Sequence, residues 1–369
     1  MAEHQSTSFT MSPPNWTDFR NYLNVTVPEH VDIARDVYRH AIPVMLGACL
    51  TTMLFNLLIL ESVHWVRRSL SPTLCFSLSL SVANAYASLV VGVGLIVNSL
   101  LPTVYDVEPG LCISLTLEAF RLTGLIASVL HLLALAINHY IGILRPLHYA
   151  ATVTKRTVGL AIASMWLLPL AFFFIYFCSV PGQGFQSRDC LYDFILCSPF
   201  RITLSGLFFF PLVMMTLIYG HIFIVVRRHQ RGAGIAVSLP GQLRRSIKAM
   251  VTTLLILGTY LLGWVPAVIF YVLTCLDCAL PIISLPLDVR LTFGILTNSL
   301  VLLKSLADPV IYVVRMPEIQ SAFRLMWLSR CGLLQLPRAG SEMTRMQTRM
   351  TDTKRSFNGI GSTKSRSKR

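Results

Sequence analysis

Residues 112–144 read CISLTLEAFRLTGLIASVLHLLALAINHYIGIL, a stretch whose formally charged residues are Glu118 and Arg121. A helix needs about 20 mainly apolar residues to cross the hydrocarbon core of a bilayer, so this stretch is long enough to span a membrane. Comparable stretches lie on either side of it, at 40–66, 73–101, 157–180, 200–226, 247–274 and 291–314. The sequence therefore predicts seven membrane-spanning segments.

The composition agrees with a membrane protein, since 54% of the residues are hydrophobic and 13% are charged. Backbone groups left unpaired in lipid are costly, so only helices and closed barrels span a bilayer. Barrel strands are short and alternate in polarity, whereas these stretches are long and continuously apolar. We therefore expect an all-α membrane protein, a seven-transmembrane helical bundle at 40–314 followed by a short amphipathic eighth helix at 315–331.

Basic residues indicate how the chain crosses the membrane. The loops after the first, third and fifth predicted spans contain clusters of Arg and Lys, among them Arg67, Arg145 and Arg227. Such loops face the cytoplasm in most membrane proteins. We therefore expect a multi-pass plasma-membrane protein whose N-terminal tail, residues 1–39, lies outside the cell. Asn15 and Asn24 each begin an N-x-T sequon in that tail and are candidate glycosylation sites.

The net charge of +14 is concentrated in the predicted cytoplasmic loops and in residues 332–369, which we expect to be a disordered cytoplasmic tail. Anionic lipid of the inner leaflet attracts basic segments of this kind, so membrane lipid is an expected partner. A nucleic-acid partner is not expected, because such proteins present an exposed basic domain.

Several residues stand at matched places in successive spans, and together they carry a family resemblance. They are Asn56, the third-span ending Asn138-His139-Tyr140, Pro211 with Tyr219, Gly263-Trp264-Val265-Pro266, and Asp308-Pro309-Val310-Ile311-Tyr312. This pattern resembles the rhodopsin-like (class A) G-protein-coupled receptors, nearest to their melanocortin, lysophospholipid, cannabinoid and adenosine branch. The resemblance implies a receptor rather than an enzyme, without cofactor or bound metal. It also implies a heterotrimeric G protein and an arrestin as partners.

Two substitutions leave a second function open. The resemblance places Asn138 and His139 where the family has an aspartate and an arginine, so both members of that pair are absent. Histidine is shorter than arginine and mostly neutral near pH 7. One reading is an atypical receptor, a scavenger, scaffold or arrestin-biased protein without classical G-protein activation. The structural alternative is that His139 only packs above the cytoplasmic opening.

Charged residues inside membrane helices are costly and suggest function. Family members hold a sodium ion between an aspartate of the second span and polar groups of the third and seventh. The matching positions here are Asn84, Ser128, Lys304 and Ser305, and the carboxylate has moved to Asp308. Residues four apart share a helix face, so Lys304 and Asp308 can form an ion pair in place of sodium. The alternative is that Lys304 extends toward water.

The outer half of the bundle is the expected ligand pocket. The resemblance places Arg121 where aminergic receptors carry an aspartate, which disfavours a simple amine. Glu118 lies one turn away, and the two charges together suit a lipid, peptide or zwitterionic ligand. The alternative is that they only neutralise each other. Trp264, Phe270 and Asn298 complete the expected pocket.

Cysteines on the outer side are expected to form disulfides. The resemblance to the melanocortin and lysophospholipid branch implies bonds within each loop, Cys190 with Cys197 and Cys275 with Cys278. Cys112 remains available for a bond to the second outer loop, as in most of the family, and sequence alone does not fix the connectivity. Cys331 follows the predicted eighth helix and is a candidate for palmitoylation.

Overall fold

The computed structural model describes residues 28–65, 70–232, 241–278, 280–281 and 284–331. Within these ranges, seven helices are long and apolar enough to cross a membrane. They are α2 (Pro28–Ser62), α3 (Pro72–Leu95), α5 (Leu111–Leu144), α7 (Lys155–Ser179), α8 (Ser198–Gly232), α9 (Gly241–Leu273) and α10 (Leu287–Arg315). The predicted all-α seven-helix architecture is confirmed.

The first helix is longer than predicted. Its hydrophobic part begins near residue 40, but α2 starts at Pro28 and takes in part of the predicted tail. Arg35 stabilises this polar extension, because its Nη2 donates to Asp106 Oδ1 at 2.7 Å and its Nε donates to the Thr103 carbonyl at 3.2 Å. The contact is made across the bundle end, so an apolar pattern along the sequence does not reveal it.

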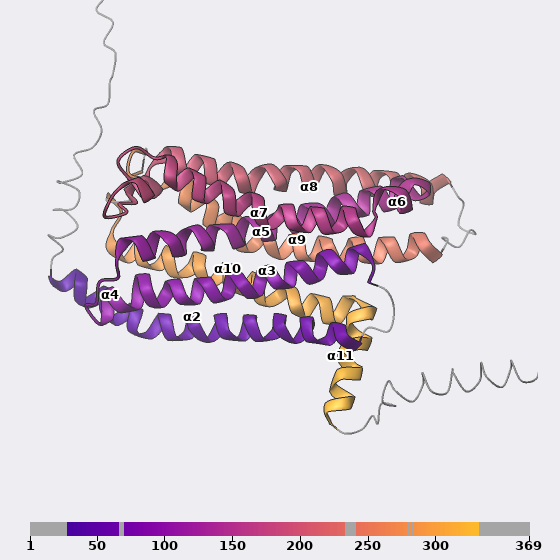
Figure 1. Cartoon of the computed structure of the whole chain (residues 1–369), viewed down its shortest axis with the longest axis horizontal. Coiled ribbons are helices and arrows are strands. Elements are labelled where there is room, and N and C mark those ends of the chain that lie inside the picture. Colours follow the sequence, from indigo (N-terminus) through magenta and orange to yellow (C-terminus); the bar gives the residue numbers. More distant parts are fainter. Residues whose placement is uncertain (1–27, 66–69, 233–240, 279, 282–283, 332–369) are drawn as a thin grey trace, which may run out of the picture.

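The second predicted span is divided in the structure. After α3 ends at Leu95, a π-helical turn covers Ile96–Leu100 and the short helix α4 covers Leu101–Val104. The helices run side by side along the long axis of the molecule, and α4 lies at one end (Figure 1). Helix α6 (Pro146–Thr152) lies at the opposite end, where α11 (Pro317–Arg330) runs crosswise to the long axis and extends beyond the side of the bundle. Helix α11 matches the predicted eighth helix.

Helix α5 is central to the packing. It contacts α3, α7, α8 and α9, and a row of its apolar residues is fully buried, including Leu115, Leu122 and Leu132. Burying a large aliphatic side chain stabilises a structure by about 1.5–3 kcal/mol where the unfolded state is in water, and in lipid close packing supplies the gain instead. Polar residues on α5 therefore lie among several helices rather than against lipid.

Two disulfides are present at the α4 end of the bundle. Cys112, at the start of α5, bonds to Cys190, and Cys275 bonds to Cys278. The predicted Cys275–Cys278 bond is confirmed. The predicted Cys190–Cys197 bond is wrong, because Cys197 is a free thiol that lies 3.7 Å from the Asp193 carbonyl oxygen.

The packing of the α7–α8 connection explains this correction. Phe194 lies against Phe177 of α7 and Phe200 of α8, with ring centroids 5.2 and 5.7 Å apart. Aromatic contacts of this kind hold the connection against the bundle. Cys190 is thereby placed over the start of α5, with a Cα–Cα distance of 4.9 Å to Cys112. A bond within this loop therefore no longer supports the resemblance to the melanocortin and lysophospholipid branch.

We predict that Cys190→Ser lowers the thermal unfolding midpoint of the purified protein strongly, whereas Cys197→Ser leaves it nearly unchanged. The Cys112–Cys190 bond closes a loop with a sequence separation of 78, and losing a native disulfide typically costs about 2–5 kcal/mol. An equal loss for both variants, or a Cys190–Cys197 peptide in a non-reducing digest, would contradict this pairing.

Candidate functional site

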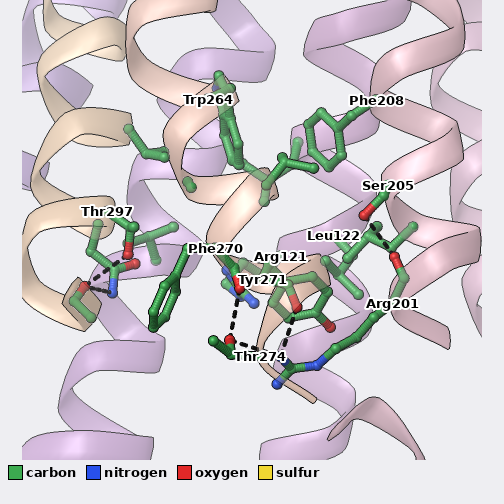
Figure 2. A pocket seen from close by; sticks show the side chains of 18 of the residues that line it. Arg121, Leu122, Arg201, Ser205, Phe208, Trp264, Phe270, Tyr271, Thr274 and Thr297 are labelled. Atoms are coloured by element: carbon green, nitrogen blue, oxygen red, sulfur yellow. Dashed lines mark hydrogen bonds between the residues drawn. The ribbon is translucent and has the colours of Figure 1, made fainter. Parts of the chain in front are cut away.

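A cavity of about 310 Å³ opens among the helices near the disulfide end. Its volume is at the lower limit of the roughly 300–1,000 Å³ that small-molecule sites occupy. Side chains from α3, α5, α8, α9 and α10 line it, and Figure 2 shows most of them. The cavity therefore draws on five helices.

Four of the five residues predicted for the pocket line this cavity, namely Arg121, Trp264, Phe270 and Asn298. Glu118 is the exception. Arg121 Nε donates to Glu118 Oε2 at 2.7 Å, and Arg121 Nη2 also contacts Glu118 Oε1. The carboxylate is thus occupied by its neighbour on the same helix, as the structural alternative anticipated.

Two arginines of the cavity were missing from the predicted pocket. Arg201, near the start of α8, is only 3% exposed and donates from Nη1 to the Tyr271 carbonyl at 2.7 Å. Its guanidinium also lies over the Tyr271 ring, 4.2 Å from the centroid. Arg290, near the start of α10, also lines the cavity. The sequence signal that could have identified Arg201 was its position inside the predicted 200–226 span, because a charged residue within a span usually has a function.

The loops above Arg201 are joined by an acidic contact. Asp277 accepts hydrogen bonds from the backbone N–H and the hydroxyl of Ser198, both at 2.7 Å. Burial raises the pKa of Asp277, but these two hydrogen bonds, together with its own backbone N–H and the positive charge of Arg201, outweigh the burial and place the pKa below its ordinary value. A carboxylate with a lowered folded-state pKa stabilises the fold above its unfolded pKa and loses that contribution as the pH falls. The contact therefore persists at neutral pH.

The inner wall of the cavity is aromatic. Trp264 stacks on Phe208, with centroids 4.9 Å apart and ring planes inclined by 24°. The next residue toward the N-terminus, Gly263, packs directly on α10: a Cβ there would lie 2.9 Å from Lys304 Cβ and 3.0 Å from the Leu300 carbonyl oxygen. Only glycine fits without a shift. Helices α9 and α10 therefore approach each other closely at Gly263, beside Trp264 of the cavity and Lys304 of the polar core.

The polar core joins α3 to α10. Lys304 Nζ lies 2.6 Å from Asp308 Oδ2, and Asn84 Nδ2 donates to the same oxygen at 2.8 Å. The side chains of the ion pair are 2% and 0% exposed. Asp308 Oδ1 is buried and has no hydrogen-bond partner among the described residues. Lys304 thus points to the carboxylate rather than extending toward water. The predicted ion pair is present, and its effect on sodium binding remains a prediction.

Ser128 and Ser305 lie nearby but do not bind the carboxylate. Ser128 Oγ donates to the Gly124 carbonyl and Ser305 Oγ to the Val301 carbonyl, both at 3.1 Å. Each hydroxyl is satisfied within its own helix, as is common for serine in membrane helices. The cluster predicted from the sequence is therefore reduced to Asn84, Lys304 and Asp308.

The remaining predicted core residues lie within helices. Asn56 donates to the carbonyl of residue 52 in α2 at 2.9 Å, and Tyr219 is buried in α8. Pro211 and Pro309 lie inside α8 and α10, each removing one backbone donor from its helix. Tyr312 belongs to α10, and its side chain lies outside the described residues.

A neutral network occupies the opposite end of α5. Asn138 Nδ2 donates to Thr73 Oγ1 at 2.9 Å, and Tyr149 OH donates to Asn138 Oδ1 at 3.0 Å. His139 is buried, with 4% exposure, and the Tyr140 hydroxyl lies 3.2 Å from His221 Nδ1. Hydrogen bonds through Asn138 thus join α3, α5 and α6 without an acid.

Three predicted modification sites lie before or at the end of the residues that the structure describes. Asn15 and Asn24 fall outside the described residues, as does the tail at 332–369. Cys331 follows α11 directly and is an exposed free thiol. Its position is compatible with acylation.

A seven-helix membrane bundle with a ligand-sized cavity near one end and a buried polar network beyond it has the architecture of a membrane receptor. A family model described as 7 transmembrane receptor (rhodopsin family) matches residues 55–312. The chain belongs to this family. It is a G-protein-coupled receptor, which transduces an extracellular ligand signal to intracellular heterotrimeric G proteins.

Several receptors are similar to the chain. Trace amine-associated receptor 2 of Rattus norvegicus is 28% identical, over 68% of this chain and 75% of that receptor. Melanocortin receptor 4 of Danio rerio is 26% identical, over 86% and 96% respectively. Trace amine-associated receptor 4 of Mus musculus is 26% identical, over 76% and 83%. These relatives support the family without selecting one branch.

The buried ion pair makes a stability prediction. Lys304→Met and Asp308→Asn should each destabilise the receptor by about 3–5 kcal/mol, because each leaves a charge buried without its partner. The double variant removes both charges and should lose less than the sum of the two. Thermal unfolding midpoints of the four purified proteins measure this coupling, and additive losses would show that the two residues act independently.

Proposed function

We propose that ligand bound in the cavity signals from Trp264, through the adjacent Gly263, to the Lys304–Asp308 core. The observation that carries this proposal is the close packing of Gly263 on Lys304 and on the Leu300 carbonyl. A ligand that presses on Trp264 acts on the same turn of α9 that touches the ion pair. Closely packed helices shift between discrete arrangements rather than deforming gradually, so the ligand changes the population of two packings.

We further propose that the disulfide end faces the outside of the cell and that the receptor resides in the plasma membrane with its N-terminus outside. Disulfides persist in oxidising compartments, and both described bonds lie at that end. The exposed thiol of Cys331 would then be cytoplasmic and open to palmitoylation. Asn15 and Asn24 would carry glycans, and the Ser/Thr-bearing tail would recruit an arrestin once phosphorylated.

Coupling to G protein is proposed to operate without the family's acid–arginine pair. Asn138 holds α3 and α6 by neutral hydrogen bonds, each of which contributes only about 0.5–1.5 kcal/mol. Nothing among the described residues favours the atypical receptor that the sequence left open. Hydrogen bonds of this strength allow the helices at this end to move.

Basal signalling tests the proposed route without a known ligand. Cells expressing the receptor with a panel of G-protein dissociation sensors should show a basal signal that Pro266→Ala lowers, because alanine restores a backbone hydrogen bond beside Trp264. Leu262→Ala is the matched control, since Leu262 is 75% exposed on the same helix. A silent receptor that His139→Arg converts to signalling would instead favour the atypical function.

The ion pair also predicts how the receptor responds to sodium. We expect the thermal midpoint of the purified receptor to be equal in sodium chloride and choline chloride of the same ionic strength. The Lys304 ammonium already neutralises Asp308, at 2.6 Å. Lys304→Met removes that cation and should make the midpoint sodium-dependent. A sodium-dependent shift in the unaltered receptor would refute the built-in cation.

A further inference from the structure

The charges of the cavity are strongly unbalanced. Three arginines from three helices line it, Arg121 of α5, Arg201 of α8 and Arg290 of α10. No Asp or Glu belongs to the lining in the part of the chain that the structure describes. Glu118 neutralises Arg121, which leaves the charges of Arg201 and Arg290 without a carboxylate partner among the described ion pairs.

Arg201 is held in place by neutral groups. Its Nη1 donates to the Tyr271 carbonyl at 2.7 Å, and weaker contacts at 3.4 Å reach Thr274 Oγ1 and the Ile195 carbonyl. Carbonyl oxygens orient a guanidinium but do not cancel its charge. Asp277 also acts on Arg201 electrostatically, but its carboxylate accepts hydrogen bonds from Ser198 rather than from Arg201. At 3% exposure the guanidinium therefore still creates a strong local potential.

Arg290 has an unused donor. Its Nε is buried and has no hydrogen-bond partner within the described residues, although the side chain lines the cavity. A buried donor without a partner costs about 1–3 kcal/mol. An acceptor delivered by a ligand removes that cost, and a carboxylate or phosphate suits the planar guanidinium best.

Arg201 and the aromatic pair of Trp264 and Phe208 lie on different sides of the cavity (Figure 2). Figure 2 shows Arg201 near Tyr271 and Thr274, whereas Trp264 and Phe208 lie at the other side of the space. Leucine and valine make up half of the other lining residues, and Ser205, Thr297 and Asn298 add polar groups. One region therefore attracts negative charge, and the other accepts an apolar body.

We propose that the cavity binds an anionic amphiphile, with a carboxylate or phosphate group at Arg201 and Arg290 and an apolar body against Trp264. This inference rests on the proposal that the cavity is the ligand site of the receptor. Two of the similar receptors are named for trace amines. The described lining of this cavity offers no carboxylate to an amine cation, and its arginines favour an anion instead.

Four probes with the same dodecyl tail test the headgroup: dodecanoate, dodecyl phosphate, dodecanol and dodecyltrimethylammonium. Each is added to the full-length receptor in lipid nanodiscs, and the thermal unfolding midpoint is measured. We expect one or both anions to raise the midpoint by about 2–4 °C, and the neutral and cationic probes not to do so. The stronger anion identifies the carboxylate or the phosphate as the preferred group.

Arg290→Gln should weaken the anion-dependent stabilisation, with an apparent dissociation constant raised about tenfold or more. Arg188→Gln makes the same charge change at an exposed residue outside the lining and should keep the unaltered response. Equal stabilisation by dodecanol or by the cation, or an unchanged anion response in Arg290→Gln, overturns the proposal. If Arg290→Gln does not fold, the headgroup comparison on the unaltered receptor decides alone.

The same experiment separates this inference from the proposed signalling route. Binding is measured without a G protein, so anion-specific stabilisation that requires Arg290 supports the ligand class even if Pro266→Ala leaves basal signalling unchanged. A receptor whose basal signal depends on Pro266 but whose stability ignores all four headgroups retains the signalling route and loses the proposed ligand class.

Discussion

The contact between Lys304 and Asp308 is the constraint on which the interior of this receptor depends. Two opposite charges lie 2.6 Å apart with almost no solvent exposure, where an unpaired charge would cost several kcal/mol. Asn84 adds the tie to α3, and Gly263 lets α9 approach the same lysine. Three helices are therefore arranged around a single neutralised pair, and α3 cannot separate from α10 without breaking the hydrogen bond from Asn84 to the Asp308 carboxylate.

In the cavity, unlike in this core, the charged side chains are not all paired within the protein. Its walls bring positive charge into a poorly solvated space, and Arg201 and Arg290 form none of the described ion pairs. Such an arrangement destabilises the empty receptor and stabilises the occupied one, because the ligand supplies the missing acceptor. The interior thus contains a core whose two charges pair with each other and a cavity whose charges pair with a ligand.

The sequence predicts the helices well because lipid enforces a simple rule, that spans must be long, apolar and helical. It also predicts the pairing of Lys304 with Asp308 and of Glu118 with Arg121, because residues three or four apart share a helix face whatever the tertiary structure. Contacts between distant segments were harder to predict. The Cys112–Cys190 bond depends on how an aromatic loop packs, and the role of Arg201 depends on the Tyr271 carbonyl, 70 residues away.

Whether a polar contact lies within one helix or between two helices has a consequence for conformational switching. The half-buried Glu118–Arg121 pair and the buried Lys304–Asp308 pair each lie within one helix, so the two charges of each pair stay together when the helix moves. The described hydrogen bonds that join α5 to α3 run between neutral groups: Asn138 donates to Thr73, the Tyr86 hydroxyl donates to the Phe120 carbonyl, and Ser79 bonds to His131. A neutral bond contributes about 0.5–1.5 kcal/mol, whereas separating a buried ion pair costs about 3–5 kcal/mol. Helices can therefore change partners at small cost while their buried charges remain paired, which is what a receptor with two closely balanced conformations requires.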